Sequence, residues 1–448
     1  MGSRVRAGAP GLTVRRWTSS GVAGLAVVLM VAVALVGGAS RAQASHANRT
    51  YEVSNLDSLG GNFAAGSSIN NAGWVAGLSR LPGNAVQHAV LWRFGSVTDL
   101  GTLGGPNSSV LWPVKNVQGA ISGIAETGQP NPLGEIWSCG RFFPSATLQI
   151  CRGFVWQDGE MRALGTLGGY NSFATGTNNR LQTVGWAETG VPGDDCVETQ
   201  VLRFHAVVWG PAENEIQDLP PLPGDTASAA TAINDNGQVV GISGSCDRAF
   251  GRFSARHSVL WENGVPINIG DLGGVAWNTP MAINRKGDIV GFANRSAGDG
   301  GSFRPRAFLS TKPGKIEDLG ALGDDPFSQA LGINEDRQVV GVSYSAGFAT
   351  CRAFLWEHGV MIDLNELSPG YSDHLCAAND INDLGQITGE AVNATGASVP
   401  FLANPVGPNS NNRLGAASAA TRAARKVSWA ALERVMTRSG VRKEDLTR

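Results

Sequence analysis

The chain has 448 residues, of which 16% are charged and 60 are glycine. An average soluble domain has roughly 25% charged residues, so this composition, with its scattered aromatic residues, favours a turn-rich all-β protein. The net charge of −2 creates no global field that would attract a polyanion, and we therefore expect no nucleic-acid partner.

The N-terminus has the pattern of an export signal. Arginines 4, 6, 15 and 16 precede residues 21–39, which carry no charge, and Ala42-Gln43-Ala44 offers small residues to a signal peptidase. We predict a signal peptide over residues 1–44 and a secreted or extracytoplasmic mature chain. The alternative is an uncleaved helix that anchors the protein, because an uncharged segment of about 19 residues can also span a bilayer.

From residue 51 to residue 405, one unit is repeated seven times. Each unit contains an Asn that is followed seven residues later by a Gly, as in AINDNGQVVG at 232–241. An N-x-x-G turn between two apolar runs predicts a β-hairpin, whose Asn caps the backbone two residues on. The pairs are Asn70/Gly77, Asn116/Gly123, Asn178/Gly185, Asn234/Gly241, Asn284/Gly291, Asn334/Gly341 and Asn382/Gly389.

A second hairpin follows in each unit. Its first arm reads HAVLW at 88–92 or RAFLW at 352–356, and its second arm often ends in Asp-Leu before an LGG linker. Four short strands at spacings of 46 to 62 residues predict a propeller blade. The seventh unit lacks its fourth strand, and YEVSNL at 51–56 is an orphan copy of it. We therefore predict an all-β, seven-bladed β-propeller of four-stranded blades over residues 51–405, closed by this N-terminal strand.

The repeat resembles a known family. GTLGG at 101–105 and 165–169, AINDNGQVVG, HAVLW and RAFLW resemble the bacterial extracellular repeats named after the motif His-Ala-Phe, the HAF family. The local departures are Leu181 and Arg337 in place of a turn Gly, and Ser310 in place of a Trp. The resemblance implies an exported, propeller-like protein, and it carries over no activity, cofactor or site residue.

The two ends of the blades should differ. Because neighbouring strands alternate in direction, the tight turns fall on one face of the ring, and the second-to-third-strand loops and LGG linkers on the other. The insertions, at about 124–150, 187–203, 242–255 and 292–304, all fall on the latter face. Long loops on a rigid scaffold usually carry binding, so we predict a partner site there; the alternative is that their aromatics only pack the insertions onto the ring. The candidate contact residues are Trp137, Arg141, Phe142, Phe143, Asp194, Asp195, Arg248, Phe250, Arg252 and Arg304.

Six cysteines in an exported chain predict disulfides. Cys139 and Cys151 share one insertion and are the first expected pair. Cys196 and Cys246 occupy similar positions in successive units, which leaves Cys351 and Cys376, although the spacing leaves the connectivity open. None of the six has metal-ligand spacing.

We predict no catalytic, cofactor-binding or metal-binding residue. His88, His205 and His257 begin equivalent strands of different blades, too far apart for a metal triad. Paired acids for glycoside cleavage need carboxyl groups that lie roughly 5–10 Å apart. The aspartates on the fourth strands belong to separate blades, and we expect their carboxyl groups to be further apart than this. Turn capping explains the seven repeated Asn residues more simply than a central ion. Calcium remains an alternative at two acidic pairs, Asp194-Asp195 and Asp324-Asp325.

After the repeats come a linker, residues 406–415, and an Ala-rich tail, residues 416–448, with Trp429, Leu432 and Met436 on one helical side. From Arg413 onward the chain has nine Arg or Lys and three Asp or Glu. This basic tail is either loosely ordered or attached to an anionic surface. Membrane contact is expected only here or through an uncleaved N-terminal segment.

Together these features predict an exported, non-catalytic propeller that binds a protein or glycan at the cell surface through its long-loop face. One alternative is a hydrolase or lyase that acts on an extracellular polymer at the same face. Another is a structural cell-surface protein. Propellers host both binding and catalysis, so the fold does not decide between them.

Overall fold

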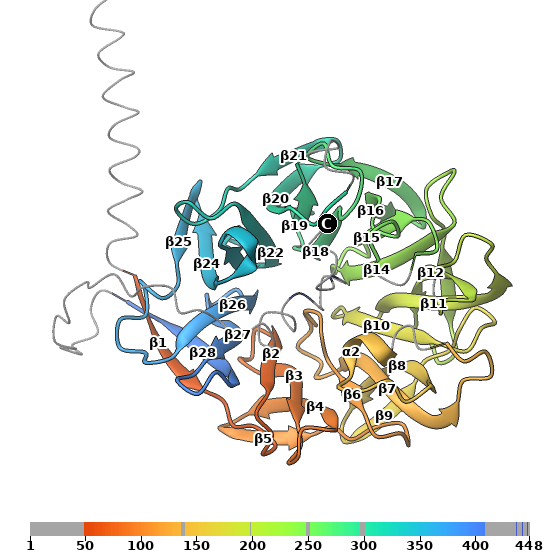
Figure 1. The fold of residues 1–448 in the computed structure, drawn as a ribbon, viewed down its shortest axis with the longest axis horizontal. Helices are drawn as coiled ribbons and strands as arrows, with labels where there is room; N and C mark the ends of the chain where they lie inside the picture. Colours follow the sequence, from red (N-terminus) through yellow and green to blue (C-terminus); the bar gives the residue numbers. More distant parts are fainter. Residues whose placement is uncertain are drawn as a thin grey trace, which may run out of the picture. The chain divides into compact units, whose positions relative to one another are not determined.

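The computed structural model describes residues 49–135, 139–197, 199–247, 251–295 and 301–407, together with Met436, Val441 and Leu446. Seven four-stranded antiparallel sheets are arranged as blades around a common axis (Figure 1). The predicted seven-bladed β-propeller is therefore confirmed. The predicted signal segment, the linker from residue 408 onward and most of the tail lie outside the described residues.

In each of the first three blades, the strands are numbered from the innermost to the outermost. Blade 1 consists of β2 (Ala64–Ile69), β3 (Val75–Arg80), β4 (Gln87–Arg93) and β5 (Ser96–Asp99). Blade 2 consists of β6 (Ser108–Ser109), β7 (Ile121–Pro130), β8 (Gln149–Gln157) and β9 (Glu160–Ala163). Blade 3 consists of β10 (Ser172–Thr177), β11 (Thr183–Pro192), β12 (Leu202–Trp209) and β13 (Ile216–Leu219).

The next three blades follow the same order. Blade 4 consists of β14 (Ala227–Ile233), β15 (Val239–Gly244), β16 (His257–Glu262) and β17 (Val265–Gly270). Blade 5 consists of β18 (Thr279–Ile283), β19 (Ile289–Asn294), β20 (Pro305–Lys312) and β21 (Lys315–Asp318). Blade 6 consists of β22 (Phe327–Ile333), β23 (Val339–Tyr344), β24 (Cys351–Glu357) and β25 (Val360–Asp363). Two short helices, α2 (Cys139–Phe142) and η1 (Ala346–Phe348), lie in the loops of blades 2 and 6.

Blade 7 is built from the first strand of the chain and its last three strands. Its inner strands are β26 (His374–Ile381), β27 (Ile387–Val392) and β28 (Ser398–Val406), and its outer strand is β1 (Thr50–Asn55). β1 pairs antiparallel with β28, from Thr50 opposite Val406 to Asn55 opposite Phe401. β2 of blade 1 packs against β27 and β28. The predicted closure by the N-terminal strand is confirmed, and it leaves no open edge on β28.

The glycine seven residues after each Asn is required by a close approach of two strands. A Cβ added at Gly241 would overlap the carbonyl oxygen of Ala229 on the neighbouring strand, and the equivalent overlap occurs in all seven blades. The glycine three residues after the Asn has a different role, since Gly237 has a φ of 81°. Leu181 and Arg337 keep this left-handed conformation at the same position, with φ values of 59° and 57°.

Successive blades are joined by hydrogen bonds as well as by apolar packing. The Ser228 hydroxyl at the start of β14 accepts a hydrogen bond from the Ala206 amide of blade 3, at 2.9 Å. Ser108, Ser172 and Ser328 make the same contact at other blade junctions. In blades 1, 3 and 4, the Trp that ends the third strand donates its indole N–H to the linker from the preceding blade, as Trp92 does to the Asp57 carbonyl. These repeated contacts make the ring one rigid scaffold.

Candidate functional site

The expected insertions lie on the expected face. We call the end of the ring that carries the second-to-third-strand connections and the linkers between blades the long-loop face, and the other end the turn face. The insertions of blades 2 and 3 begin later than the sequence predicted, because β7 and β11 run on to Pro130 and Pro192, which pair with Gln149 and Leu202. These extended hairpins project beyond their sheets and carry the loops at their tips.

The candidate aromatic residues that are described pack inward. Phe142 and Phe143 are buried, and the Phe142 ring lies 5.8 Å from Trp112 and 5.2 Å from Phe173. These aromatic contacts hold α2 against the propeller, in line with the alternative that the aromatic residues pack the insertions onto the blades. Trp137, Arg248 and Phe250 lie outside the described residues. A role of these aromatics in partner contact stays a prediction.

The candidate charged residues are spread over the face. Asp194 and Arg304 are exposed, Arg141 is half-buried, and the Arg252 guanidinium lies 4.8 Å from the centre of the Phe253 ring. Asp195 accepts hydrogen bonds from the Thr226 hydroxyl, the Arg203 guanidinium and the Cys246 amide. Although burial acts to raise its pKa, these bonds outweigh burial and hold the pKa of Asp195 below its usual value. Asp195 therefore organises the junction between blades 3 and 4.

Two disulfides each join successive blades. Cys196 of blade 3 is bonded to Cys246 of blade 4, as expected, with their Cα atoms 4.4 Å apart. The remaining pair, Cys351 and Cys376, joins blades 6 and 7. Cys151 is disulfide-bonded as well, but the side chain of its expected partner Cys139 is not among those described. Disulfides fit an oxidising, extracytoplasmic environment.

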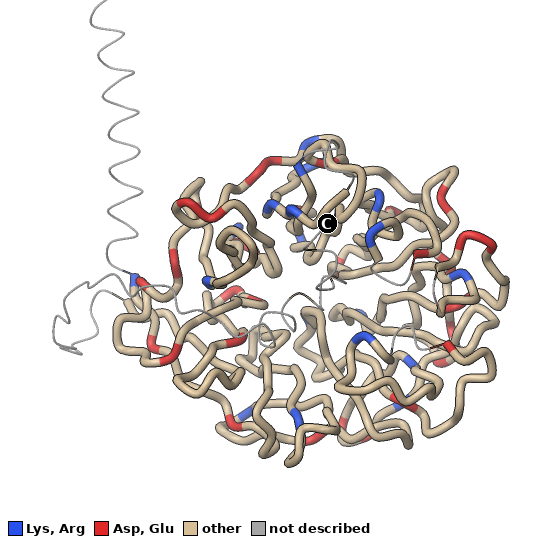
Figure 2. The backbone as a smooth tube through the Cα atoms, viewed as in Figure 1, with Lys and Arg blue, Asp and Glu red and all other residues tan. Residues whose placement is uncertain are grey.

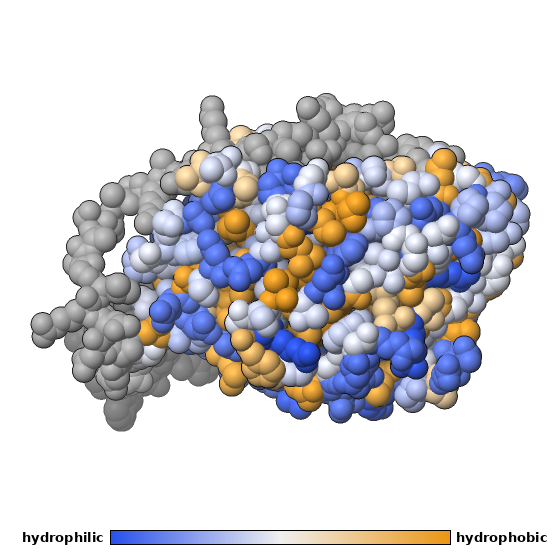
Figure 3. Space-filling model, turned by 90° about the horizontal axis from the view of Figure 1, so that it is seen from below, coloured by the Kyte–Doolittle hydropathy of each residue, from blue (hydrophilic) through white to orange (hydrophobic). Residues whose placement is uncertain are grey.

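Exposed apolar side chains are concentrated on one sector of the long-loop face. Of the 13 exposed large hydrophobic residues in the described part of the chain, seven belong to this face. All seven lie between the insertion of blade 2 and the linker that enters blade 5: Leu133, Leu148, Val191, Val197, Val201, Phe253 and Val275. The side wall of the ring seen in Figure 3, by contrast, mixes hydrophobic and hydrophilic residues.

The turn face has a pocket at its centre. The seven repeated Asn residues surround it, and we call it the axial pocket; its volume is about 110 Å³, with six of the seven in its lining. The Oδ1 atom of Asn234 accepts hydrogen bonds from the amides of Asn236 and Gln238, which confirms turn capping. Its Nδ2 atom donates 2.9 Å to the carbonyl oxygen of Asn284 in the next blade. The same bond recurs around the ring, except that Asn116 donates to the Thr177 carbonyl.

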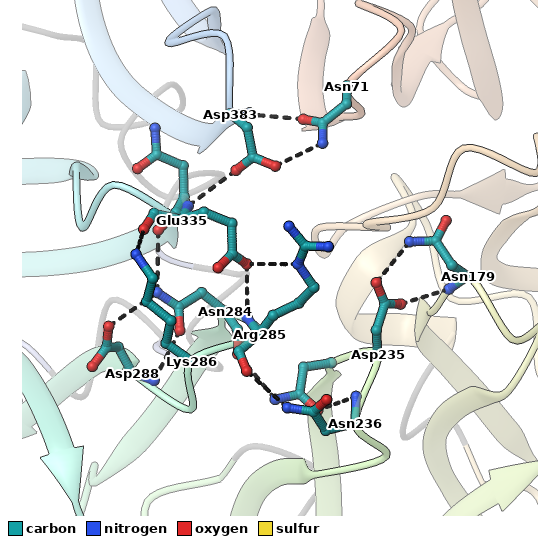
Figure 4. Close-up of polar contacts among 12 residues, drawn as sticks. Asn71, Asn179, Asp235, Asn236, Asn284, Arg285, Lys286, Asp288, Glu335 and Asp383 are labelled. Carbon is teal, nitrogen blue, oxygen red and sulfur yellow. Dashed lines mark hydrogen bonds and ion pairs between the residues drawn. The ribbon is translucent and has the colours of Figure 1, made fainter.

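A second belt of hydrogen bonds surrounds the mouth of the axial pocket. It is formed by residues that directly follow the repeated Asn residues, and Figure 4 shows six of them: Asn71, Asn179, Asp235, Arg285, Glu335 and Asp383. The Asp383 carboxylate accepts the Glu335 amide at 3.0 Å, and the Glu335 carboxylate accepts the Arg285 amide at 2.8 Å. Asp235 binds the amide and side chain of Asn179 in the same way. The acidic side chains of this belt therefore join neighbouring turns.

One ion pair lies beneath this belt. Lys115 Nζ is 2.5 Å from Asp380 Oδ1 and donates to the Ile381 carbonyl at the same distance. Asp380 is fully buried, and burial raises its pKa although Lys115 acts in the opposite direction. Lys115 also lines the axial pocket. Sequence reasoning missed this pair; the signal was a Lys at a position where five of the seven units have Ile.

The repeated His and Asp residues pair within blades. His88 Nδ1 lies 2.8 Å from Asp99 and His205 Nδ1 lies 3.0 Å from Asp218. In blades 5 and 6 an Arg replaces the His, and Arg306 and Arg352 bind Asp318 and Asp363. His257 instead binds Asp225 of the preceding linker, at 2.9 Å. These contacts fit the predicted structural role of the residues.

Two buried carboxyl groups face each other between blades 2 and 3. Glu188 Oε1 and Glu135 Oε2 both accept hydrogen bonds from Asn171 Nδ2. Burial, reinforced by the charge of Glu135, raises the pKa of Glu188 to about 7. Glu135 also accepts the amides of Val201 and Leu202, which fixes the tip of the blade 3 insertion. Nothing in the repeat pattern predicted this pair, because Glu135 lies in an insertion.

One member of each acidic pair considered for calcium has other partners. Asp325 accepts hydrogen bonds from Ser343 and Arg352. Asp195 accepts hydrogen bonds from Thr226, Arg203 and Cys246. Within the described ranges, no group of three or more His, Cys, Asp or Glu residues is placed to hold a metal ion. No helix in this part of the chain has the length and apolar character needed to cross a membrane. Basic and acidic residues both occur around the ring (Figure 2).

No family model and no curated protein matches the chain. Two solved structures are distantly similar. One is an acylaminoacyl peptidase from Pyrococcus horikoshii, with 13% identity and a TM-score of 0.46, and the alignment covers 79% of this chain and 53% of that one. The other is a PQQ-bound aldose sugar dehydrogenase from Streptomyces coelicolor, with 12% identity, a TM-score of 0.34 and coverage of 80% and 98%. The chain thus spans about half the length of the peptidase. These likenesses carry no activity, substrate or cofactor over to this chain.

Proposed function

We propose that this protein is an exported, non-catalytic propeller of the HAF-repeat type that binds a protein partner through the long-loop face of blades 2 to 4. The observation that carries the proposal is the group of seven exposed apolar side chains on this sector. Single exposed hydrophobic residues are common, but a concentration of them on one sector is typical of an interaction surface. The Cys196–Cys246 disulfide and the Glu135 bonds pre-organise the loops that carry them.

The chemistry of this sector favours a protein over a glycan. Six of the seven exposed side chains are Leu or Val, which pack against apolar side chains of a partner. Glycan sites instead use exposed aromatic faces for stacking on sugar rings, and Phe253 is the one aromatic residue of the seven. The exposed Asp194 and Arg304 belong to a polar rim.

The proposal is tested with the purified full-length protein and the surface of the cells that produce it. A variant carrying Leu133→Ser, Val191→Ser and Val197→Ser removes apolar contacts on the long-loop face. A matched control carries Val117→Ser, Val265→Ser and Leu384→Ser, at exposed positions on the turn face. We expect the first variant to bind at least about tenfold more weakly, which corresponds to about 1.4 kcal/mol, and the control to bind like the wild type.

Treatment of the cells separates the candidate partners. Binding that is lost after protease treatment and survives periodate oxidation supports a protein partner. Loss after periodate alone would instead support a glycan, and turnover of any added cell-wall polymer would support the enzyme alternative. Equal weakening by both triple variants would overturn the assignment to the long-loop face.

A further inference from the structure

One apolar cluster at the long-loop end of the blades draws side chains from the whole ring. It lies towards that end because it includes Phe173 near the start of β10, Tyr344 at the end of β23, and the loop residues Phe142 and Phe348. We call it the central apolar cluster. Its members from blades 1 to 7 include Phe63, Trp112, Trp186, Ile242, Phe292, Tyr344 and Ala377.

The C-terminal segment of the chain is seated in this cluster. Met436 and Val441 belong to it and are 1% and 3% exposed, and Leu446 packs against it. The Val441 amide donates a hydrogen bond to the Met436 carbonyl at 3.3 Å. Met436 is as deeply buried as Trp112 and Trp277 of the same cluster. Residues from the last part of the chain therefore complete the apolar packing of the ring.

The connection to the ring is long enough for this seat to be reversible. β28 ends at Val406 opposite Thr50, and its strand direction places this end on the turn face. Met436 lies at the opposite end of the blades, and a chain as long as the 28 residues between Gly407 and Met436 spans roughly 90 Å when extended. A blade strand of six to nine residues measures only about 20–30 Å. The tether thus allows the segment to sit in the cluster, leave it and return.

We propose that the central apolar cluster is a binding site for a short apolar peptide segment, and that Met436, Val441 and Leu446 of the same chain are its resident anchors. Met, Val and Leu at spacings of five residues supply the anchors, and a Met side chain adapts readily to an irregular apolar site. Because the ligand is tethered, its effective concentration is high, and an external peptide of similar chemistry has to displace it. The bound C-terminal residues thus inhibit the binding of an external peptide to the central apolar cluster. This contact does not depend on the partner proposed for the insertions.

The test uses the full-length chain with the anchors changed to charged residues. Met436→Asp/Val441→Asp should release the segment, because a carboxylate cannot be buried without a partner. Asn411→Asp/Asn412→Asp adds the same charge in the linker and serves as the matched control. We expect the anchor variant to show severalfold stronger binding of the dye ANS and stronger acrylamide quenching of Trp fluorescence, and the control to match the wild type.

A free peptide that reverses the increase in ANS binding distinguishes release of the C-terminal residues from unfolding of the propeller. A synthetic peptide of residues 431–448 should suppress ANS binding by the anchor variant, whereas the same peptide with both Asp substitutions should not. The labelled peptide should also bind the anchor variant at least about tenfold more tightly than it binds the wild type, in which the site is occupied. Unchanged ANS binding in the anchor variant would overturn the seat, and an increase that the peptide does not reverse would overturn the binding site.

Discussion

Lys115 and Asp380 show how individual departures from the repeat compensate each other. Five of the seven units have Ile at the position of Lys115, and the other units have Ser, Val, Gly or Ala at the position of Asp380. The two exceptions form one ion pair across blade 1. A second pair behaves alike: Arg337 replaces a turn Gly and binds Asp288, which stands where four other units have Gln. These four departures therefore form two contacting pairs.

Removing one member of the Lys115–Asp380 pair should cost more than removing both. Lys115→Ile leaves the fully buried Asp380 carboxylate without its cation, and we expect the free energy of unfolding to fall by about 3–5 kcal/mol. Lys115→Ile/Asp380→Ala returns both positions to the pattern of the other blades and should recover most of this loss. Urea unfolding of the two variants measures the difference. A double variant as unstable as the single one would contradict the pairing.

Glu188 should make stability depend on pH near neutrality. Its pKa is about 7 in the folded protein and 4.5 for an ordinary Glu, so the fold favours the protonated form. The stabilisation is complete below about pH 4.5 and is lost as the pH rises through 7, with a total on the order of 3 kcal/mol. Glu188→Gln should flatten the urea-unfolding profile between pH 5 and pH 8, and exposed Glu160→Gln should not. A profile that stays as steep in the Glu188 variant would refute this assignment.

At the scale of the strand pair, the two repeated glycines should lose different amounts of stability on the same substitution. Gly241→Ala places a methyl group against the Ala229 carbonyl, which is backbone and cannot move aside, so we expect a loss of roughly 3 kcal/mol or failure to fold. Gly237→Ala strains only a left-handed turn and should cost about 1 kcal/mol, because Leu181 and Arg337 already occupy that conformation. The melting temperatures of the two variants measure this difference. Equal decreases in melting temperature would contradict the explanation that two strands approach closely at Gly241.

The strands and turns were predictable from the sequence because their causes are local. The Asn cap, the turn glycine and the alternating apolar residues act within one hairpin, and each recurs seven times. The tips of the insertions were not predictable, because their partners come from elsewhere. Phe142 is buried by Trp112 and Phe173 of two blades, and nothing within its own loop distinguishes it from an exposed anchor.

For the whole molecule, closure by β1 should decide whether the ring unfolds as one unit. A chain that begins at Leu56 lacks the strand that pairs with β28 and exposes that edge. We expect it to melt at a markedly lower temperature and to self-associate, as measured by calorimetry and light scattering. A chain that begins at Arg49 keeps β1 and is the matched control. Identical melting and a monomeric shortened chain would show that closure is dispensable.

The number of blades and their closure were predictable because both follow from counting units along the chain. The seat of the C-terminal segment was not. Met436 and Val441 stand five residues apart in a basic, Ala-rich stretch, and their neighbours in space come from strands far apart in the sequence. Long-range contacts of this kind leave no periodic signal.

The side-chain hydrogen bonds of the Asn residues around the axial pocket all point in the same direction around the ring. Each Asn donates its side-chain amide to a backbone carbonyl of the blade that follows it along the chain, and Asn382 donates back to Asn70, so these seven hydrogen bonds form a closed circuit around the ring. Such a circuit is completed only when the angle between blades lets every amide reach the next carbonyl. Adding or deleting one repeat would change that angle at every junction at once. The circuit therefore favours a ring of seven blades. The Asn residues that form it are the same ones that cap the turn of each unit.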